Sequence, residues 1–134
     1  MSSPLMAERL IVDASAMVDV LLGAGRATAI RDRLRGYDLH VPAHFDAEVL
    51  SALGRLERAG HLRASDAEER LDRVSGAPLE RHPLAPLLSG AWRRRHNLRL
   101  VDALYVELAQ QLEAPIVTVD AGLAAAAPIA ELID

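Results

Sequence analysis

Cysteine and lysine are both absent from this chain of 134 residues. Without cysteine there is no disulfide, no thiolate nucleophile and no zinc or iron–sulfur centre held by cysteine. Without lysine, every mechanism that needs a lysine amine is excluded, and all 15 basic side chains are arginines. Their planar guanidinium groups are suited to paired hydrogen bonds with phosphate or carboxylate groups.

Aromatic residues are also scarce, at 3% of the chain, so leucine, valine, isoleucine and alanine must build the hydrophobic core. The formal net charge is −4, which argues against a protein that coats nucleic acid without specificity. It does not exclude an enzyme that holds RNA locally beside an acidic metal site.

No apolar run approaches the roughly 20 residues that a membrane span needs. The first residues lack the basic and then apolar pattern of a secretory signal. We therefore expect a cytoplasmic protein that is not associated with a membrane. The length suits one hydrophobic core, so we expect a single domain over residues 1–134.

Expected strands and helices alternate along the chain. Hydrophobic patterning predicts strands at 9–12, 37–42 and 115–120, with weaker ones at 78–83 and 129–133. It predicts helices at 14–22, 27–35, 43–59, 84–96 and 100–112, one that begins at Ser65 with a capping box to Glu68, and a short one after Asp120. This alternation indicates an α/β fold, in which helices flank both faces of a central parallel sheet.

Two aspartates follow directly after the two most apolar strands. Asp13 closes the first of these strands, and Asp120 closes "PIVTVD". In open parallel sheets the functional crevice lies beyond the carboxyl ends of the strands. We therefore expect both carboxylates at the same edge of the sheet.

Two further acids lie in apolar surroundings. Glu48 comes just before Val49 and Leu50 in a helix, and Asp102 is flanked by Val101 and Ala103. Carboxylates in such places usually need a partner or a metal ion. Oxygen ligands of this kind suit Mg²⁺ or Mn²⁺, which can activate water for the hydrolysis of a phosphodiester.

Each acid also has a structural interpretation, which the sequence leaves open. Asp13 could cap the following helix, and Asp102 could stabilise a helix N-terminus through the helix dipole. Asp120 could be a turn residue, and Glu48 could lie at the border of an exposed helix face.

Four segments, in this order, carry a family resemblance: "IVDASAMV", "HFDAEVLSAL", "LRLVDALYVELAQQL" and "PIVTVDAGL". With them the chain resembles the PIN-domain ribonucleases over essentially its full length. In particular it resembles the VapC toxins of bacterial toxin–antitoxin pairs.

The resemblance implies a site and an activity. Asp13, Glu48, Asp102 and Asp120 match the acidic quartet that binds Mg²⁺ or Mn²⁺ in the family, and Ser15 and Thr118 match its supporting hydroxyl positions. The implied activity is metal-dependent endonucleolytic cleavage of RNA by water. The implied partners are a VapB-like antitoxin, which commonly inserts an arginine into the active-site groove, and a second copy of the chain in a homodimer.

The chain departs from the family pattern at two places. Residues 121–124 read Ala-Gly-Leu-Ala, where many members carry another aspartate or asparagine, so the rim of the metal site is expected to be thinner. Glu107 replaces a common small residue. At five positions beyond Asp102 on a helix, its side chain is expected to point into solvent.

Other polar residues have less definite roles. Arg93, Arg94 and Arg95 form the one dense basic cluster, which either grips RNA phosphates or a partner, or is the solvated end of a helix. Asp19 is expected at the surface rather than at the edge of a groove. The histidines show no pair with metal-ligand character and are expected to be surface or core residues.

Other functions remain as alternatives. A PIN-domain ribonuclease could serve RNA processing rather than act as a toxin, or the domain could bind without catalysis. A phosphatase of the haloacid-dehalogenase type would use Asp13 as nucleophile, but Ser15 stands where that class has a second aspartate. A receiver domain would need a lysine that the chain lacks.

Overall fold

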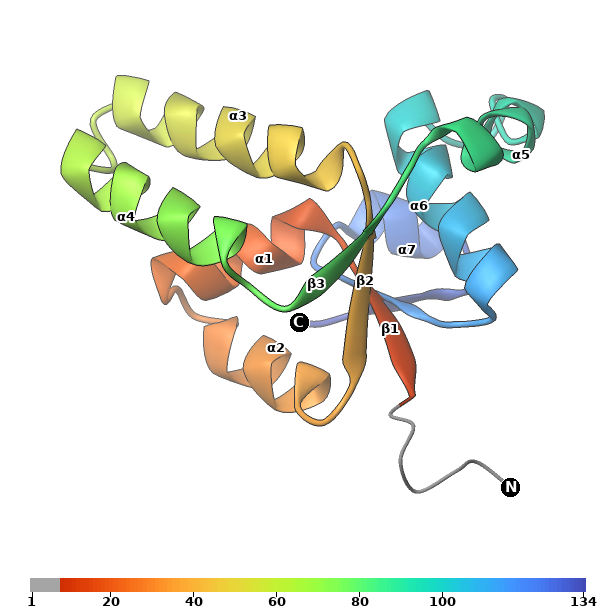
Figure 1. Cartoon of the computed structure of the whole chain (residues 1–134), viewed down its shortest axis with the longest axis horizontal. Coiled ribbons are helices and arrows are strands. Elements are labelled where there is room, and N and C mark those ends of the chain that lie inside the picture. The colour runs from red at the N-terminus through yellow and green to blue at the C-terminus, as the bar shows by residue number, and fades with distance from the viewer. Residues whose placement is uncertain (1–7) are drawn as a thin grey trace.

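A five-stranded parallel sheet runs through the centre of the molecule (Figure 1). The computed structural model describes residues 8–134. The sheet has the order β3-β2-β1-β4-β5, and all its neighbouring strands are parallel. The strands are β1 (Arg9–Val12), β2 (Asp38–Pro42), β3 (Leu79–His82), β4 (Ile116–Thr118) and β5 (Ala130–Leu132). The weak strand predicted at 78–83 is confirmed, and it lies at an edge of the sheet.

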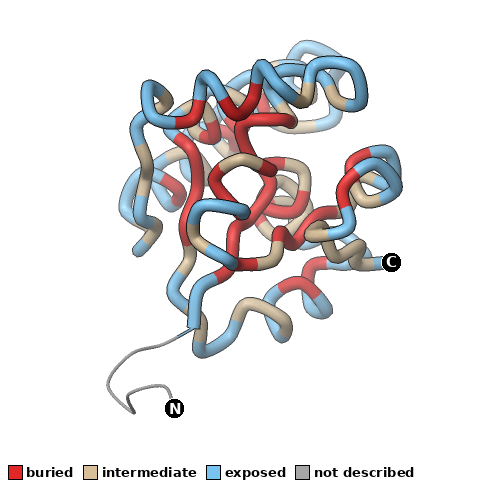
Figure 2. The backbone as a smooth tube through the Cα atoms, turned by 90° about the vertical axis from the view of Figure 1, so that its right-hand side faces the viewer, coloured by how far each residue is buried: buried red, intermediate tan, exposed pale blue. Residues whose placement is uncertain are grey.

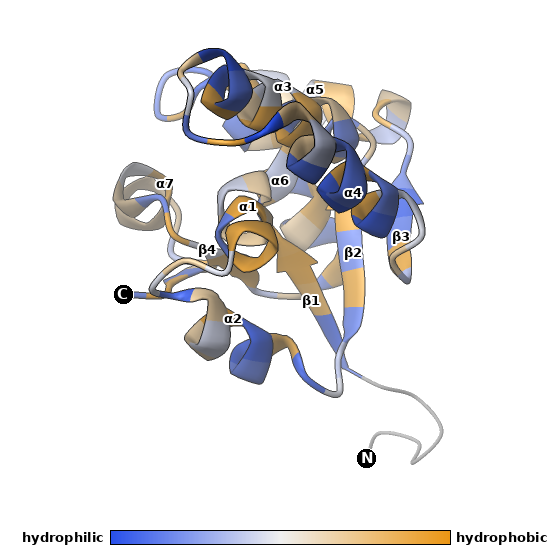
Figure 3. Cartoon of the chain, turned by 90° about the vertical axis from the view of Figure 1, so that its left-hand side faces the viewer, coloured by the Kyte–Doolittle hydropathy of each residue, from blue (hydrophilic) through white to orange (hydrophobic). Residues whose placement is uncertain are grey.

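Helices cover both faces of this sheet, as predicted. They are α1 (Ala14–Leu22), α2 (Ala27–Leu34), α3 (Phe45–Arg58), α4 (Ala64–Ser75), α5 (Leu88–Arg93), α6 (Leu100–Leu112) and α7 (Ala121–Ala126), with a short 3-10 helix η1 (Ala85–Leu87). Figure 1 shows α1 to α4 on one side of the strands and α5 and α6 on the other. In Figure 3, β1 and α1 are mainly hydrophobic, whereas α4 on the outside is mainly hydrophilic.

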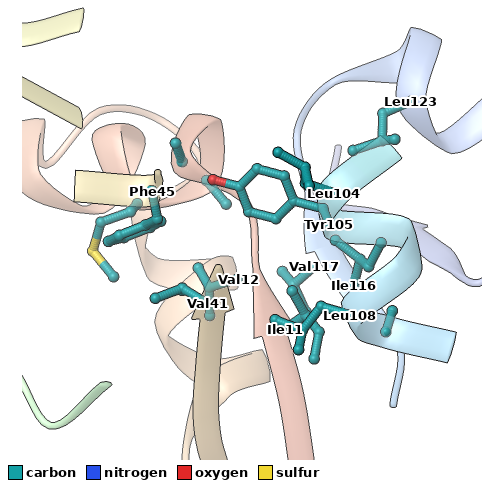
Figure 4. Packing of buried hydrophobic residues seen from close by; sticks show 14 of the residues in the cluster. Ile11, Val12, Val41, Phe45, Leu104, Tyr105, Leu108, Ile116, Val117 and Leu123 are labelled. Atoms are coloured by element: carbon teal, nitrogen blue, oxygen red, sulfur yellow. The ribbon is translucent and has the colours of Figure 1, made fainter. Parts of the chain in front are cut away.

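The hydrophobic core lies between the sheet and these helices. Leu10, Ile11 and Val12 of β1 are fully buried, as a strand covered on both faces requires. Figure 2 shows buried chain in the interior and exposed chain along the outer turns of the helices. Tyr105 of α6 is the largest fully buried side chain, and Figure 4 shows it above the aliphatic side chains of β1 and β4.

Two local predictions are wrong. The helix predicted over 84–96 is instead a 3-10 turn that contains Pro86, followed by α5, which ends at Arg93. Beyond it the chain forms turns, in which the amide of Asn97 donates to the carbonyl of Arg94 three residues earlier. The capping box at Ser65 does not form, because α4 begins at Ala64 and no side chain caps it.

No helix within residues 8–134 combines the length and the apolar character needed to cross a bilayer. The described residues share one sheet and one hydrophobic cluster. The single domain over 1–134 stays a prediction, because its first seven residues lie outside the described part.

Candidate active site

The four acids singled out in the sequence line one cavity at the carboxyl ends of β1 and β4. The cavity has a volume of about 360 Å³. Its charged lining residues are Asp13, Asp19, Glu48, Asp102 and Asp120, with Arg55 and Arg99. The predicted meeting of carboxylates at one edge of the sheet is therefore confirmed. Carboxylates outnumber guanidinium groups in this lining, so the cavity has an excess of negative charge.

Asp13 is held by two hydroxyl groups. It is 6% exposed, and its Oδ2 accepts hydrogen bonds from Ser15 Oγ at 2.6 Å and from Thr118 Oγ1 at 2.7 Å. The pairing of β1 with β4 brings Asp13 to Thr118, since Val12 lies beside Val117. Asp13 stands at the N-cap position of α1, but its side chain makes no capping hydrogen bond. The structure therefore does not support the helix-cap interpretation of this residue.

Asp120 is held by hydrogen bonds from its backbone and from its side chain. Its backbone amide donates to Thr118 Oγ1 at 3.0 Å, so one threonine hydroxyl contacts both aspartates. Its Oδ1 accepts from the amides of Gly122 and Leu123 at 2.9 and 3.2 Å, which caps α7. Asp120 is thus a helix cap and a lining residue of the cavity at once.

Glu48 enters the cavity from the first turn of α3. Its Oε1 accepts a hydrogen bond from the hydroxyl of Tyr105 at 2.7 Å. Burial raises the pKa of Glu48 above its ordinary value, and the nearby Asp13 and Asp102 raise it further. The hydrogen bond from Tyr105 lowers this pKa, but it does not cancel the rise. Burial and the Glu48 carboxylate also raise the pKa of Tyr105, so the phenol stays protonated as a donor.

His44 packs beside this pair. Its Nε2 lies 2.9 Å from the carbonyl oxygen of Val101, and because a carbonyl only accepts, we assign the ring proton to Nε2. Its ring meets that of Tyr105 edge to face at 5.0 Å between centroids. Its Nδ1 is buried and has no hydrogen-bond partner within residues 8–134.

Arg99 and Arg55 are charged residues of the cavity that the sequence analysis missed. Arg99 precedes α6 and donates to Asp102 from Nε at 3.0 Å and from Nη2 at 3.4 Å, and this contact raises the pKa of Arg99. The Arg99 side chain is 73% exposed, whereas that of Asp102 is 14% exposed. A sequence signal exists for both arginines. Arg99 lies three residues before Asp102, and Arg55 lies two helical turns after Glu48 on the same face of α3.

The basic cluster Arg93–Arg95 does not line the cavity. Arg94 instead forms an ion pair with Glu107 at 3.3 Å, and the Arg95 guanidinium lies 4.6 Å from the centre of the Trp92 ring. The expectation that Glu107 points into solvent is wrong, because its side chain is only 13% exposed. The Glu107 carboxylate fits against α5 because Gly90 has no side chain to occupy that space.

Asp19 and the histidines also differ from expectation. Asp19 lines the edge of the cavity and forms an ion pair with Arg26 at 3.2 Å, so its placement at the open surface is wrong. The absence of a metal-like histidine pair is also wrong, because His40 and His82 meet beside Glu80 on β2 and β3.

Comparisons with known proteins decide the family. The PIN domain family matches residues 10–128. Over 127 residues the chain is 51% identical to ribonuclease VapC3 of Mycobacterium tuberculosis, with 94% of this chain and 93% of that protein covered. The chain belongs to the VapC ribonucleases of the PIN-domain family. This excludes the phosphatase and the receiver domain as alternatives.

Solved structures show the same fold. The crystal structure of PAE2754 from Pyrobaculum aerophilum matches with a TM-score of 0.68 at 26% identity, over 92% of this chain and 82% of that one. VapBC2 from Rickettsia felis, crystallised with a DNA fragment from its promoter, matches with a TM-score of 0.68 at 14% identity, over 94% and 99% of the two chains. The predicted PIN-like architecture is therefore confirmed.

Proposed function

We propose that this chain is a metal-dependent endoribonuclease and the toxin of a toxin–antitoxin pair. The observation that carries the proposal is the cavity into which four separate elements bring Asp13, Glu48, Asp102 and Asp120. Carboxylates that approach one another in this way raise the free energy of the empty site, and a cation removes that repulsion. Membership of the VapC ribonucleases supports RNA as the substrate. The cytoplasm stays the proposed place of action.

The donor set fits Mg²⁺ or Mn²⁺. All four acids offer oxygen ligands, which these ions prefer, and no hydrogen bond from residues 8–134 reaches Oδ1 of Asp13. We infer that Asp13, Glu48, Asp102 and Asp120 hold the ion. When bound, such an ion supplies Lewis acidity, which activates water and offsets the negative charge that develops on the phosphodiester.

The remaining residues of the cavity orient these ligands and bind the substrate. Ser15 and Thr118 fix the orientation of Asp13, and Tyr105 fixes that of Glu48. Arg99 is largely exposed while it holds Asp102, so its outer nitrogens can donate to a phosphate of the RNA. RNA binding by Arg93, Arg94 and Arg95 stays a prediction, because these residues lie outside the cavity.

A VapB-like antitoxin is the proposed inhibitor. Five carboxylates against two guanidinium groups in the lining make the cavity a receptor for an inserted arginine. A guanidinium forms paired hydrogen bonds with carboxylates, so the antitoxin would take the place of both the ion and the RNA phosphate.

A homodimer is proposed through the outer face of α5 and α6. Four large hydrophobic side chains are exposed there and surround a hollow of about 350 Å³: Leu88, Trp92, Leu100 and Val101. Exposed apolar groups gathered in this way are typical of an interface between protein chains.

RNA cleavage in vitro tests the activity. We expect the purified chain to cleave RNA at internal positions when Mg²⁺ or Mn²⁺ is present. The cleavage should stop when EDTA is added. Asp13→Asn keeps the volume of the side chain but removes its charge, and we expect it to reduce the cleavage rate at least about 100-fold. The matched control is Asp72→Asn on the exposed side of α4, which should retain the rate. Equal rates in wild type and Asp13→Asn with metal present would contradict the proposal.

Growth of a bacterial host separates a toxin from an RNA-processing enzyme. Induction of the wild-type chain should arrest growth, and induction of Asp13→Asn should not. Coexpression of a small protein encoded beside it should restore growth. Efficient cleavage in vitro without any arrest would favour RNA processing.

A further inference from the structure

A second cluster of metal-ligating side chains lies outside the active-site cavity. His40 of β2 and Glu80 and His82 of β3 place one ligand atom each within 4.8 Å of the others. His40 Nδ1 lies 2.8 Å from His82 Nε2 and 3.4 Å from Glu80 Oε2. None of the three residues lines the acidic cavity.

The parallel pairing of β2 and β3 fixes the backbone beneath this cluster. In the register of the two strands, His40 lies beside Glu80, and Pro42 lies beside His82. The amide of Ala43 donates to the carbonyl of His82 at 2.8 Å, which continues the pairing past the end of β2. The three side chains are at alternate positions and therefore share one face of the sheet. The backbone beneath the ligand set is thus in place before any ion arrives.

The protonation of the pair also favours a cation. Two ring nitrogens 2.8 Å apart cannot both carry a proton, so they share one between them. His40 is only 5% exposed. A metal ion can replace the shared proton.

The geometry matches a tetrahedral ion after a small adjustment. Zn–N bonds of about 2.0–2.1 Å place two ligand nitrogens about 3.4 Å apart, so the two nitrogens, now 2.8 Å apart, need to separate by about 0.6 Å. The Glu80 side chain is 68% exposed and can turn toward the ion. Three protein ligands leave one position of a tetrahedral ion for water. The two imidazole nitrogens favour a transition-metal ion over Mg²⁺, which prefers oxygen ligands.

We propose that His40, Glu80 and His82 form a second metal site, which binds Zn²⁺ or a similar transition-metal ion independently of the acidic cavity. The ion ties the edge strand β3 to β2. Its effect is to stabilise the folded chain, since it binds the folded state and has no assembled site in the unfolded one.

Metal binding by the full chain tests this proposal. Zn²⁺ is titrated by calorimetry with an excess of Mg²⁺ present to occupy the acidic cavity, and the melting temperature is recorded with and without Zn²⁺. We expect one Zn²⁺ per chain and a rise in melting temperature for the wild type. The His82→Gln variant should bind Zn²⁺ at least about tenfold more weakly, and Zn²⁺ should not raise its melting temperature. His96→Gln, an exposed histidine outside the cluster, should behave as wild type.

Two further measurements keep the test decisive. Glu80→Gln alters an exposed side chain and should weaken Zn²⁺ without unfolding the chain. The ¹⁵N chemical shifts of the wild-type imidazoles should change at His40 and His82 when Zn²⁺ is added. Unchanged shifts at both rings, or equal affinity in wild type and His82→Gln, would overturn the proposal. Zn²⁺ binding that disappears in Asp13→Asn instead would place the ion in the acidic cavity and also overturn it.

Discussion

One oxygen atom of Asp13 carries both hydroxyl contacts that hold its carboxylate. Ser15 and Thr118 both donate to Oδ2, and the Thr118 hydroxyl also accepts from the amide of Asp120. The threonine is fully buried, so its hydroxyl has no water to replace these partners. It therefore determines the orientation of two proposed metal ligands at once.

Replacing Thr118 by valine tests this role. The change keeps the shape of the side chain but removes the hydroxyl, so Asp13 loses one donor and the amide of Asp120 loses its acceptor. We expect a roughly 10-fold or greater fall in kcat/KM for RNA cleavage and a loss of about 1–3 kcal/mol in the free energy of unfolding. Thr118→Ser keeps a hydroxyl and should retain more activity. Equal kcat/KM in the two variants would contradict the role.

Glu48 predicts a pH-dependent stability. Its pKa in the folded chain lies above its ordinary value of 4.5, so the folded state binds this proton more tightly than the unfolded state does. The free energy of unfolding therefore falls as pH rises from the ordinary pKa through the raised one. Glutamine carries no such proton, and its amide oxygen can still accept from Tyr105.

We expect Glu48→Gln without divalent ions to be more stable than wild type at pH 7.5, with the difference vanishing toward pH 4. Thermal unfolding with EDTA at a series of pH values measures it. Glu57→Gln, at an exposed position of the same helix, should show no such trend. A difference between Glu48→Gln and wild type that stays constant with pH would contradict the prediction.

Among the elements, α5 and α6 are held together by an unusually close contact. A Cβ atom added to Gly90 would collide with the Glu107 carboxylate, which pairs with Arg94 and accepts from Gln111. An alanine at this position would have to displace the carboxylate end of the Glu107 side chain, whereas the backbone conformation of Gly90 does not itself need glycine.

Two helical glycines should therefore respond in opposite ways to alanine. Gly90→Ala displaces the Glu107 carboxylate from its partners, and we expect a loss of about 1–3 kcal/mol in the free energy of unfolding. Gly54→Ala meets only the flexible end of Arg58 at 3.6 Å, and we expect a gain of about 0.5–1 kcal/mol, because alanine favours the helix. Urea denaturation measures both. A rise in the free energy of unfolding of Gly90→Ala would contradict the prediction.

The elements were largely predictable because their patterns are local. Apolar runs placed β1 and β4, and helical periodicity placed α3 and α6. Two predictions failed because a contact distant in sequence decided them. Glu107 turns inward only because α5 packs against α6, and His40 meets His82 only because β2 and β3 are paired. A single sequence shows neither contact.

For the whole molecule, the acids of the site could be predicted because the topology of a parallel sheet fixes where strands end. The arginines of the cavity were missed, because exposed side chains follow no burial pattern and only their spacing to Asp102 and Glu48 pointed to the site. Arg55 is an exposed residue of α3 and Arg99 is an exposed residue just before α6, whereas the more conspicuous Arg93–Arg95 lie elsewhere.

The proposed dimer is a property of the assembled surface. Leu88 and Leu50 are both 57% exposed, but Leu88 belongs to the apolar face of α5 and α6, and Leu50 belongs to α3. We expect the wild type and Leu50→Glu to be dimers and Leu88→Glu to be a monomer, because the interface would have to bury the new charge. Light scattering after gel filtration measures the mass. A dimeric Leu88→Glu would place the interface elsewhere.

The crowding of like charges in the cavity has an evolutionary consequence. Neutralising Glu48, whose pKa is raised by burial and by its acidic neighbours, relieves repulsion, so in the absence of the ion it stabilises the fold while it abolishes the proposed catalysis. Selection for thermal stability alone would therefore remove the Glu48 carboxylate. We infer that the presence of this carboxylate reflects selection for the proposed activity.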